Sequence, residues 1–352
     1  MRVLFDVNHP AQVHLFKNAY WELEADGHGV HVTSREKEIT TDLLDQYGID
    51  HTPLTAERDG GAPALAAEWA KREAKMFSLA RSFDPDVIVS RLNPPAVHVS
   101  RMTGSRNVIF KDTILRSRAI RALYHGATCP FVDKICTPPG FDVPVPARKH
   151  DIVGFQELSY LHPDWFEPDA DVLREYGVEP DDPFFVLRFA GWDAYHDVGS
   201  QGLSPEGKRE LVEYLAERGD VYITSEEELP PEFEEYRISV PAHRIHDLLY
   251  HADLYVGDSQ TMPTEAALLG TPAIRANSVV GDGDMNNFVE LEEEYGLLFS
   301  YADEDAAMRK ISEIVENPES DGAWEERRRR LVEDKPDVTN TMLDLVYDAA
   351  HR

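Results

Sequence analysis

Short apolar runs alternate with longer amphipathic segments in the first part of the chain. Apolar runs typical of buried strands cover 1–7, 29–33, 87–90, 107–110 and 134–137. Helical periodicity covers 12–26, 42–47 and 62–83, with further helical segments between the later strands. Buried strands that alternate with helices predict a parallel sheet covered by helices on both faces.

The same alternation returns in the second half of the chain. Strands are predicted at 184–189, 221–224, 254–257 and 273–275. Helices are predicted at 204–218, 246–251, 262–269, 291–295, 303–316 and 339–352. Between about 143 and 171 the pattern weakens, because prolines and aromatic residues occur there without clean periodicity. We interpret this stretch as a linker.

These two series predict an α/β fold with two Rossmann-like domains whose parallel sheets face each other across a cleft. A chain of 352 residues suits this arrangement, since a single core rarely grows beyond about 250–300 residues. The predicted boundaries are 1–155 for the N-terminal domain, 156–170 for the linker, 171–335 for the C-terminal domain and 336–352 for a closing helix.

The composition describes a folded chain with a strongly acidic surface. The hydrophobic content of 42% is that of a globular protein, although the formal net charge is -30. Acidic residues spread over the whole sequence suit a halophilic protein, in which hydrated carboxylates keep the surface soluble. An ordinary acidic cytosolic protein is the alternative. In both cases the negative net charge argues against nucleic acid as a partner, because binding to phosphates needs basic patches.

Several cellular locations are disfavoured by the sequence. No stretch reaches the roughly 18 apolar residues that a membrane span needs, so we expect a cytoplasmic protein, with peripheral membrane association and oligomeric state left open. Cys129 and Cys136 have six residues between them. This spacing matches no metal or redox motif, and we expect two buried thiols in a reducing compartment.

A loop-to-helix turn in the second series is the strongest candidate for chemistry. The strand at 254–257 ends in a turn of small and polar residues, Gly257, Asp258, Ser259, Gln260 and Thr261. The free N–H groups and the positive end of the following helix then face one point, which suits the phosphates of a nucleotide. Asp258, Ser259 and Thr261 are also ordinary helix N-caps, so a purely structural role stays open.

Two charged residues near this turn strengthen the nucleotide hypothesis. Glu265 lies about one turn into the helix, in an otherwise apolar segment. A carboxylate there is placed to accept both hydroxyls of a ribose, although it could equally stabilise the helix dipole. Arg275 ends the next strand, where parallel sheets place ligands. It either meets a phosphate or pairs with a surface acid.

This segment resembles the nucleotide-sugar signature of the glycosyltransferase B (GT-B) superfamily, particularly the non-hydrolysing UDP-N-acetylglucosamine 2-epimerases and the MurG-type transferases. There a strand, a Ser/Gly turn on the diphosphate and a helix Glu on the ribose occur in this order. The whole chain is also similar to a largely archaeal family described as predicted glycosyltransferases, with marks within 5–10, 188–197, 257–259 and 281–288. The resemblance implies a GT-B-like fold and a UDP-linked sugar as donor.

The first strand-to-helix turn of the N-terminal domain contains Asn8 and His9, followed by Gln12 and His14. In the resembled transferases this turn is rich in glycine and approaches the acceptor or the donor phosphates. Here it has no glycine, so its side chains would have to act. His9 or His14 could be a general base near neutral pH. Alternatively, Asn8 and His9 only shape and cap the turn.

Further candidates lie at other strand ends. Arg188 leaves the first strand of the C-terminal domain and could clamp a diphosphate. His196 follows in a polar and aromatic loop and could supply an acid or base. The resemblance implies that Arg244 and Ile245 contact the nucleotide base through backbone groups. It also places Asp112 near the catalytic acid of the epimerases.

We predict a metal-independent glycosyltransferase that takes a sugar from a nucleoside diphosphate, in cell-surface or glycoconjugate biosynthesis. The donor set is Arg188, Arg244, Ile245, Asp258, Ser259, Gln260, Thr261, Glu265 and Arg275, and the catalytic candidates are His9, His14, Asp112 and His196. No Asp-x-Asp stands where a cation would meet donor phosphates, so we expect no metal and no cofactor. The alternatives are an epimerase of the UDP-N-acetylglucosamine 2-epimerase type and a nucleotide-sugar-binding protein without catalysis.

Overall fold

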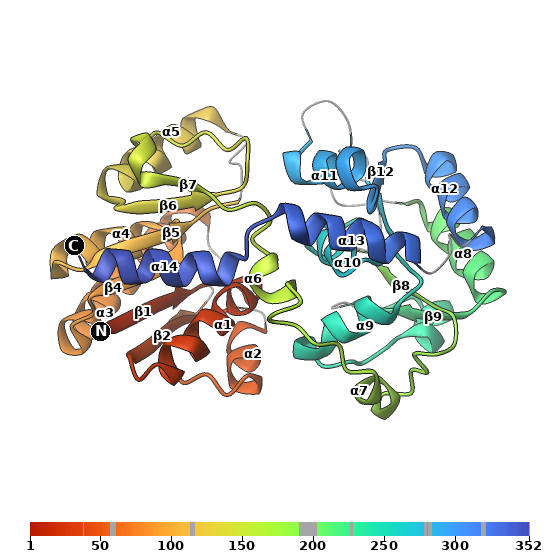
Figure 1. Ribbon diagram of the computed structural model, residues 1–352, viewed down its shortest axis with the longest axis horizontal. Helices are drawn as coiled ribbons and strands as arrows, with labels where there is room; N and C mark the ends of the chain where they lie inside the picture. The colour runs from red at the N-terminus through yellow and green to blue at the C-terminus, as the bar shows by residue number, and fades with distance from the viewer. Residues whose placement is uncertain are drawn as a thin grey trace. The chain divides into compact units, whose positions relative to one another are not determined.

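A computed structural model describes residues 1–37, 39–56, 61–112, 117–189, 203–225, 228–277, 280, 284–317 and 322–351. The chain divides into two compact units (Figure 1). Unit 1 comprises Met1–Trp165 together with Lys335–Arg352, and unit 2 comprises Phe166–Asp334. The boundary near the middle of the chain therefore falls inside the segment that the sequence pattern indicates as a linker.

Unit 1 is built on a seven-stranded parallel sheet in the order β3-β2-β1-β4-β5-β6-β7. Its strands are β1 (Arg2–Val7), β2 (Gly29–Glu36), β3 (His51–Ala56), β4 (Val87–Arg91), β5 (Arg106–Phe110), β6 (Lys134–Thr137) and β7 (His150–Ile152). Its helices are α1 (Pro10–Ala25), α2 (Thr40–Gln46), α3 (Gly61–Phe83), α4 (Pro94–Thr103), α5 (Arg118–Thr128), α6 (Leu158–Leu161) and α14 (Val338–Ala350).

The middle of this sheet is buried on both faces, as its continuous apolar strands predict. Leu4 belongs to one cluster with Ile88 of β4 and Met76 of α3. The next side chain, Phe5, packs instead on Phe16 of α1, with ring centroids 5.6 Å apart. Successive side chains of a strand point to opposite faces, so a strand that is apolar at every position needs cover on both.

Helix α14 completes unit 1 although it comes from the end of the chain. It contacts β4, β5 and α1, and Figure 1 shows it running beside these strands. The backbone oxygen of Ser159 accepts hydrogen bonds from Thr339 Oγ1 and Asn18 Nδ2, each at 2.7 Å. These bonds join α14 and α1 to the segment before the unit boundary.

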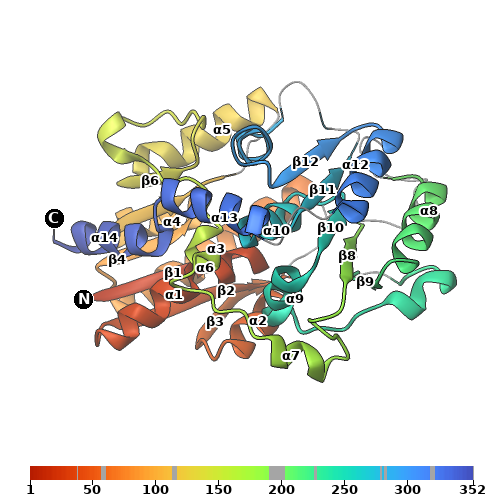
Figure 2. The same cartoon turned by 45° about the vertical axis from the view of Figure 1, so that its right-hand side comes forward.

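Unit 2 holds a five-stranded parallel sheet in the order β12-β11-β10-β8-β9 (Figure 2). Its strands are β8 (Phe184–Arg188), β9 (Asp220–Ile223), β10 (Leu254–Gly257), β11 (Ala273–Ala276) and β12 (Leu298–Tyr301). Its helices are α7 (Ala170–Glu175), α8 (Pro205–Ala216), α9 (Ile245–His251), α10 (Thr261–Leu269), α11 (Asn286–Glu290), α12 (Glu304–Glu316) and α13 (Gly322–Asp334). On one face Leu187 and Ile274 pack in a core cluster with Leu211 of α8 and Ile311 of α12.

Three strands of the structure were not expected from the sequence pattern. They are β3, β7 and β12, and each lies at the edge of its sheet. Strand β3 contains Pro53, and β7 has only three residues. Edge strands pair on one side only and tolerate proline and polar residues. Strands β3 and β7 therefore lack the apolar run that marks the central strands, whereas β12 has one in Leu298 and Phe299 that the sequence analysis did not assign.

Both sheets have one point where the strand order reverses. In unit 1 it lies between β1 and β4, and in unit 2 between β8 and β10. Open α/β sheets bind ligands outside the carboxyl ends of the strands at such points. The candidate turns after β1 and after β10 both occupy these positions.

Candidate functional site

The turn after β10 is fixed to both neighbouring strands of unit 2. Gly257 pairs in register with Arg188, the last residue of β8. The backbone N–H of Asp258 donates to the Arg188 carbonyl at 3.3 Å. From the other side, Asn277 Nδ2 donates to the Asp258 carbonyl at 2.9 Å. Ser259 is half-buried, while Gln260 and Thr261 are exposed, so the turn offers its polar groups at the surface.

Gly257 is required here by space. A Cβ at this position would lie 2.3 Å from Tyr255 Oη and 2.6 Å from the Arg188 carbonyl oxygen. The Tyr255 ring is fully buried beneath the turn, and its hydroxyl lies 3.4 Å from Ser259 Oγ. Burial raises the pKa of the Tyr255 phenol, which is therefore a neutral support for the turn.

Glu265 lies inside unit 2. The residue is 4% exposed, and its Oε1 is 3.2 Å from Nε2 of His246, which is 2% exposed. The contact joins α10 to α9. A buried carboxylate is tolerated only when it has partners, and this pairing distinguishes Glu265 from an exposed glutamate that merely stabilises a helix dipole.

Arg275 is engaged within its own unit. It is 1% exposed, forms an ion pair with Asp284 and lies 3.7 Å over the Phe288 ring. Its Nε also donates to Ser300 Oγ at 3.2 Å. Of the two expectations for this residue, the structure shows pairing with an acid, and it does so in the interior. Arg275 therefore ties β11 to β12 and to the start of α11.

Arg244 and Ile245 stand at the start of α9. Arg244 lies 3.5 Å from Asp247 and 3.8 Å from Asp169, with about a third of its side chain exposed. Ile245 is the first residue of the helix. The structure thus places both at the end of the loop that the resemblance indicates for the nucleotide base.

Lys208 is a residue near the turn that the sequence reasoning missed. It lies in the first turns of α8, is 2% exposed and has its ammonium 5.1 Å over the Phe189 ring. Burial lowers the pKa of Lys208, while the charges of Asp258 and Glu304 raise it. The sequence signal that could have indicated Lys208 is the helix start at Ser204-Pro205, which comes after the candidate residue Arg188 at the end of its strand.

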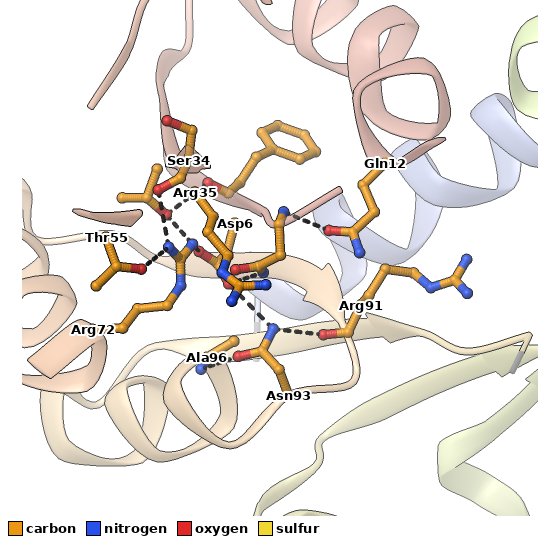
Figure 3. Close-up of polar contacts among 12 residues, drawn as sticks. Asp6, Gln12, Ser34, Arg35, Thr55, Arg72, Arg91, Asn93 and Ala96 are labelled. Atoms are coloured by element: carbon orange, nitrogen blue, oxygen red, sulfur yellow. Dashed lines mark hydrogen bonds and ion pairs between the residues drawn. The ribbon is translucent and has the colours of Figure 1, made fainter. Parts of the chain in front are cut away.

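The corresponding turn of unit 1 is held by a buried carboxylate. Asp6, at 0% exposed, forms an ion pair with Arg72 of α3. It also accepts hydrogen bonds from Thr33 Oγ1 at 2.8 Å, Asn8 Nδ2 at 2.9 Å and Asn93 Nδ2 at 3.1 Å. Figure 3 shows these contacts converging from β1, β2, α3 and the loop after β4. The network fixes the geometry of the turn at the reversal point.

The two histidine candidates for a base have different surroundings. His9 is exposed and caps α1, with Nδ1 accepting from the Ala11 N–H at 3.3 Å. A neutral ring that accepts at Nδ1 carries its proton on Nε2, so His9 must release this cap before it can act as a base. His14 is 7% exposed, with Nδ1 3.1 Å from Tyr47 Oη and its ring 5.2 Å from that of Tyr160. Its surroundings are those of a packed core histidine.

Asp112 belongs to an ion pair at the carboxyl ends of β4 and β5. Arg91 Nη1 donates to Asp112 Oδ2 at 2.6 Å and to Gln156 Oε1 at 2.9 Å. The adjacent Lys111 is 8% exposed. Burial and, next, the charge of Arg91 lower the pKa of Lys111 from 10.5 to about 8.

We expect the Lys111 ammonium to titrate with a midpoint near 8. The folded protein releases this proton before the unfolded chain does, so the Lys111 contribution to stability improves as the pH rises from about 8 to 10.5. NMR titration of lysine ¹³Cε resonances measures the midpoint, and Lys111→Gln assigns the signal. An assigned midpoint at 10 or above would contradict the burial argument.

His196, the remaining catalytic candidate, lies outside the described residues. Among the residues that are described, one group, His162, Asp164 and Asp337, brings its possible ligand atoms within 4.8 Å of one another. Asp337 is already occupied as the N-cap of α14 and as acceptor for Trp165 Nε1. This group therefore gives no argument for a metal centre.

Solved structures share this architecture along their whole length. A UDP-N-acetylglucosamine 2-epimerase matches with a TM-score of 0.68 at 14% identity, over 100% of this chain and 97% of that chain. The spinosyn forosaminyltransferase SpnP matches with 0.64 at 16% identity, over 99% of each chain. MurG of Acinetobacter baumannii matches with 0.59 at 14% identity, over 99% of this chain and 100% of that chain. The two parallel sheets with their helices thus form a GT-B fold of two Rossmann-like domains.

The chain belongs to the family described as "Protein of unknown function (DUF354)", whose model matches residues 1–351. No curated protein gives a significant sequence match. The fold that the turn at Gly257 implied is confirmed. In the described part of the chain, every helix is too short or too polar to cross a membrane.

Proposed function

We propose that the protein is a glycosyltransferase that takes its sugar from a nucleoside diphosphate. The donor in this proposal is a UDP-linked sugar, which binds to unit 2. The observation that carries the proposal is the turn between β10 and α10. It lies at the strand-order reversal of its sheet, presents Ser259, Gln260 and Thr261 at the start of a helix, and has Glu265 one turn further on.

The chemistry follows from these positions. The helix N-terminus and the N–H groups of the turn stabilise the charge that develops on the departing diphosphate. Arg188, the strand neighbour of Gly257, supplies a positive charge to the same group. Glu265 accepts the ribose hydroxyls while His246 holds its other side. In this scheme no metal or cofactor is needed to neutralise the leaving group.

Unit 1 binds the acceptor in this proposal. His9 takes the proton of the acceptor hydroxyl after it leaves its cap on Ala11, since that contact is long, at 3.3 Å. The Asp6 network holds the turn on which His9 stands. His14 keeps a packing role.

Glu265→Gln should weaken UDP binding by about tenfold or more, because a ribose hydroxyl loses a charged acceptor. Isothermal titration with UDP measures the change. The matched control is Glu313→Gln, an exposed glutamate on α12 that pairs with its helix neighbour Lys310. Unchanged UDP affinity in folded Glu265→Gln would remove Glu265 from the donor site.

The reaction class is tested by incubating the purified protein with UDP-sugars in concentrated KCl, which suits its acidic surface. Release of UDP that depends on an added acceptor, and that persists in EDTA, supports a metal-independent transferase. Inversion of the sugar without acceptor would instead indicate an epimerase, with Asp112 as acid or base. Binding without turnover would indicate a nucleotide-sugar-binding protein.

A further inference from the structure

A cavity of about 480 Å³, open to solvent, lies in unit 1 beside α5. Arg118, Arg121 and His125 line it from one face of the helix, since they are three and four residues apart. Cys129 and Pro144 line it from the segments that follow. None of the residues that line it in the described part of the chain is a carboxylate, although the chain has a net charge of -30.

The surroundings of the cavity are positively charged. The pKa of His125 is lowered first by burial and then by the charges of Lys111 and Arg121, with Asp142 acting in the opposite direction. Lys111 is 8% exposed and lies at the carboxyl end of β5. Two arginines and a histidine thus line one cavity, the charge of the buried Lys111 acts on that histidine, and Asp142 acts on it in the opposite direction. Arg118 is exposed and Arg121 half-buried, so water screens part of this like charge, and an anion in the cavity would offset the remainder.

His125 supplies a second observation. It is 8% exposed, and its Nε2 has no hydrogen-bond partner among the described residues. Buried polar atoms are nearly always hydrogen-bonded. This nitrogen is shielded from solvent, so an oxygen-rich ligand in the cavity that His125 lines becomes its partner when the imidazole turns toward the cavity.

We propose that this cavity binds a phosphate-type oxyanion, and that the anion is a phosphate group of the acceptor substrate. Arginine suits this ligand because its planar fork matches two phosphate oxygens, and lysine adds a point charge. Lys111, whose charge acts on His125 in the cavity wall, follows β5 and precedes the candidate residue Asp112. Anion binding stands on unit 1 alone, whereas its assignment to an acceptor rests on the proposed function.

The first test measures binding of methyl phosphate to the full-length protein by isothermal titration. Arg121→Gln and the exposed Arg118→Gln should each weaken binding by about tenfold, the loss of one charge-assisted contact. Arg101→Gln, an exposed arginine of α4 outside the cavity, should leave it unchanged. Equal affinity in wild type and in both folded cavity variants would overturn the proposal.

Two further arms identify the anion and separate this site from the donor site. Sodium acetate in place of methyl phosphate should bind more weakly, since a carboxylate carries one charge; tighter acetate binding would overturn the phosphate assignment. UDP affinity should be the same in Arg118→Gln as in wild type. If Glu265→Gln loses UDP binding but still binds methyl phosphate, the anion site is independent of the donor site. If the protein binds methyl phosphate but no UDP-sugar, the anion site stands and the acceptor assignment fails.

Discussion

Gly257→Ala should abolish nucleotide binding by unit 2 and lower its free energy of unfolding by about 1–3 kcal/mol. The added methyl group would lie 2.6 Å from the Arg188 carbonyl oxygen and 2.3 Å from Tyr255 Oη. The first contact is with the backbone of a paired central strand, which cannot move without breaking its ladder. The clash is therefore relieved by displacement of the turn itself, the element that we assign to the diphosphate.

The prediction is measured by urea unfolding and by titration with UDP. Gly322→Ala is the matched control, because a Cβ there meets no atom within 4 Å and the residue begins α13 of the same unit. The control should retain wild-type stability and UDP affinity. Normal UDP binding in Gly257→Ala would mean that displacement of the turn leaves the nucleotide site intact. That result would contradict the assignment of the turn to the phosphates.

Asp6→Asn should destabilise unit 1 by about 3–5 kcal/mol, which is the cost of leaving a buried charge without its partner. Arg72 is 3% exposed and loses its carboxylate, while the new amide turns donors toward the side chains of Asn8 and Asn93. Because this network also holds the turn that carries His9, acceptor-dependent activity should fall even where the variant remains folded.

Denaturant unfolding of unit 1 measures the effect, with Asp45→Asn as control. Asp45 also pairs with a basic side chain, His51, but its own side chain is 74% exposed, and such surface pairs contribute about 0–1 kcal/mol. The double variant Asp6→Asn/Arg72→Met should be less destabilised than the sum of the single changes, since it removes both members of the pair. Additive losses would contradict the coupling.

The central strands were predictable because most carry a short run of apolar residues, such as Val3, Leu4 and Phe5 in β1. A strand such as β1, buried on both faces, needs this pattern wherever it lies in the sheet. The edge strands β3, β7 and β12 carry no such demand, and the sequence analysis missed them. Helix α14 showed its periodicity, but periodicity does not say which unit a helix covers. Its place follows from contacts with β4, β5 and α1, more than two hundred residues away in the chain.

The candidate site divides in the same way. The sequence by itself determined the turn at Gly257 and the helix that follows, because small residues between a strand and a helix are a local signal. It also determined the acidic surface and the GT-B resemblance. Only the tertiary structure decided that Arg275 pairs with Asp284, that His14 is packed against Tyr160, and that Asp6 meets Arg72. The physical reason is that burial and pairing of a charge depend on side chains from distant elements, and no local pattern carries that information.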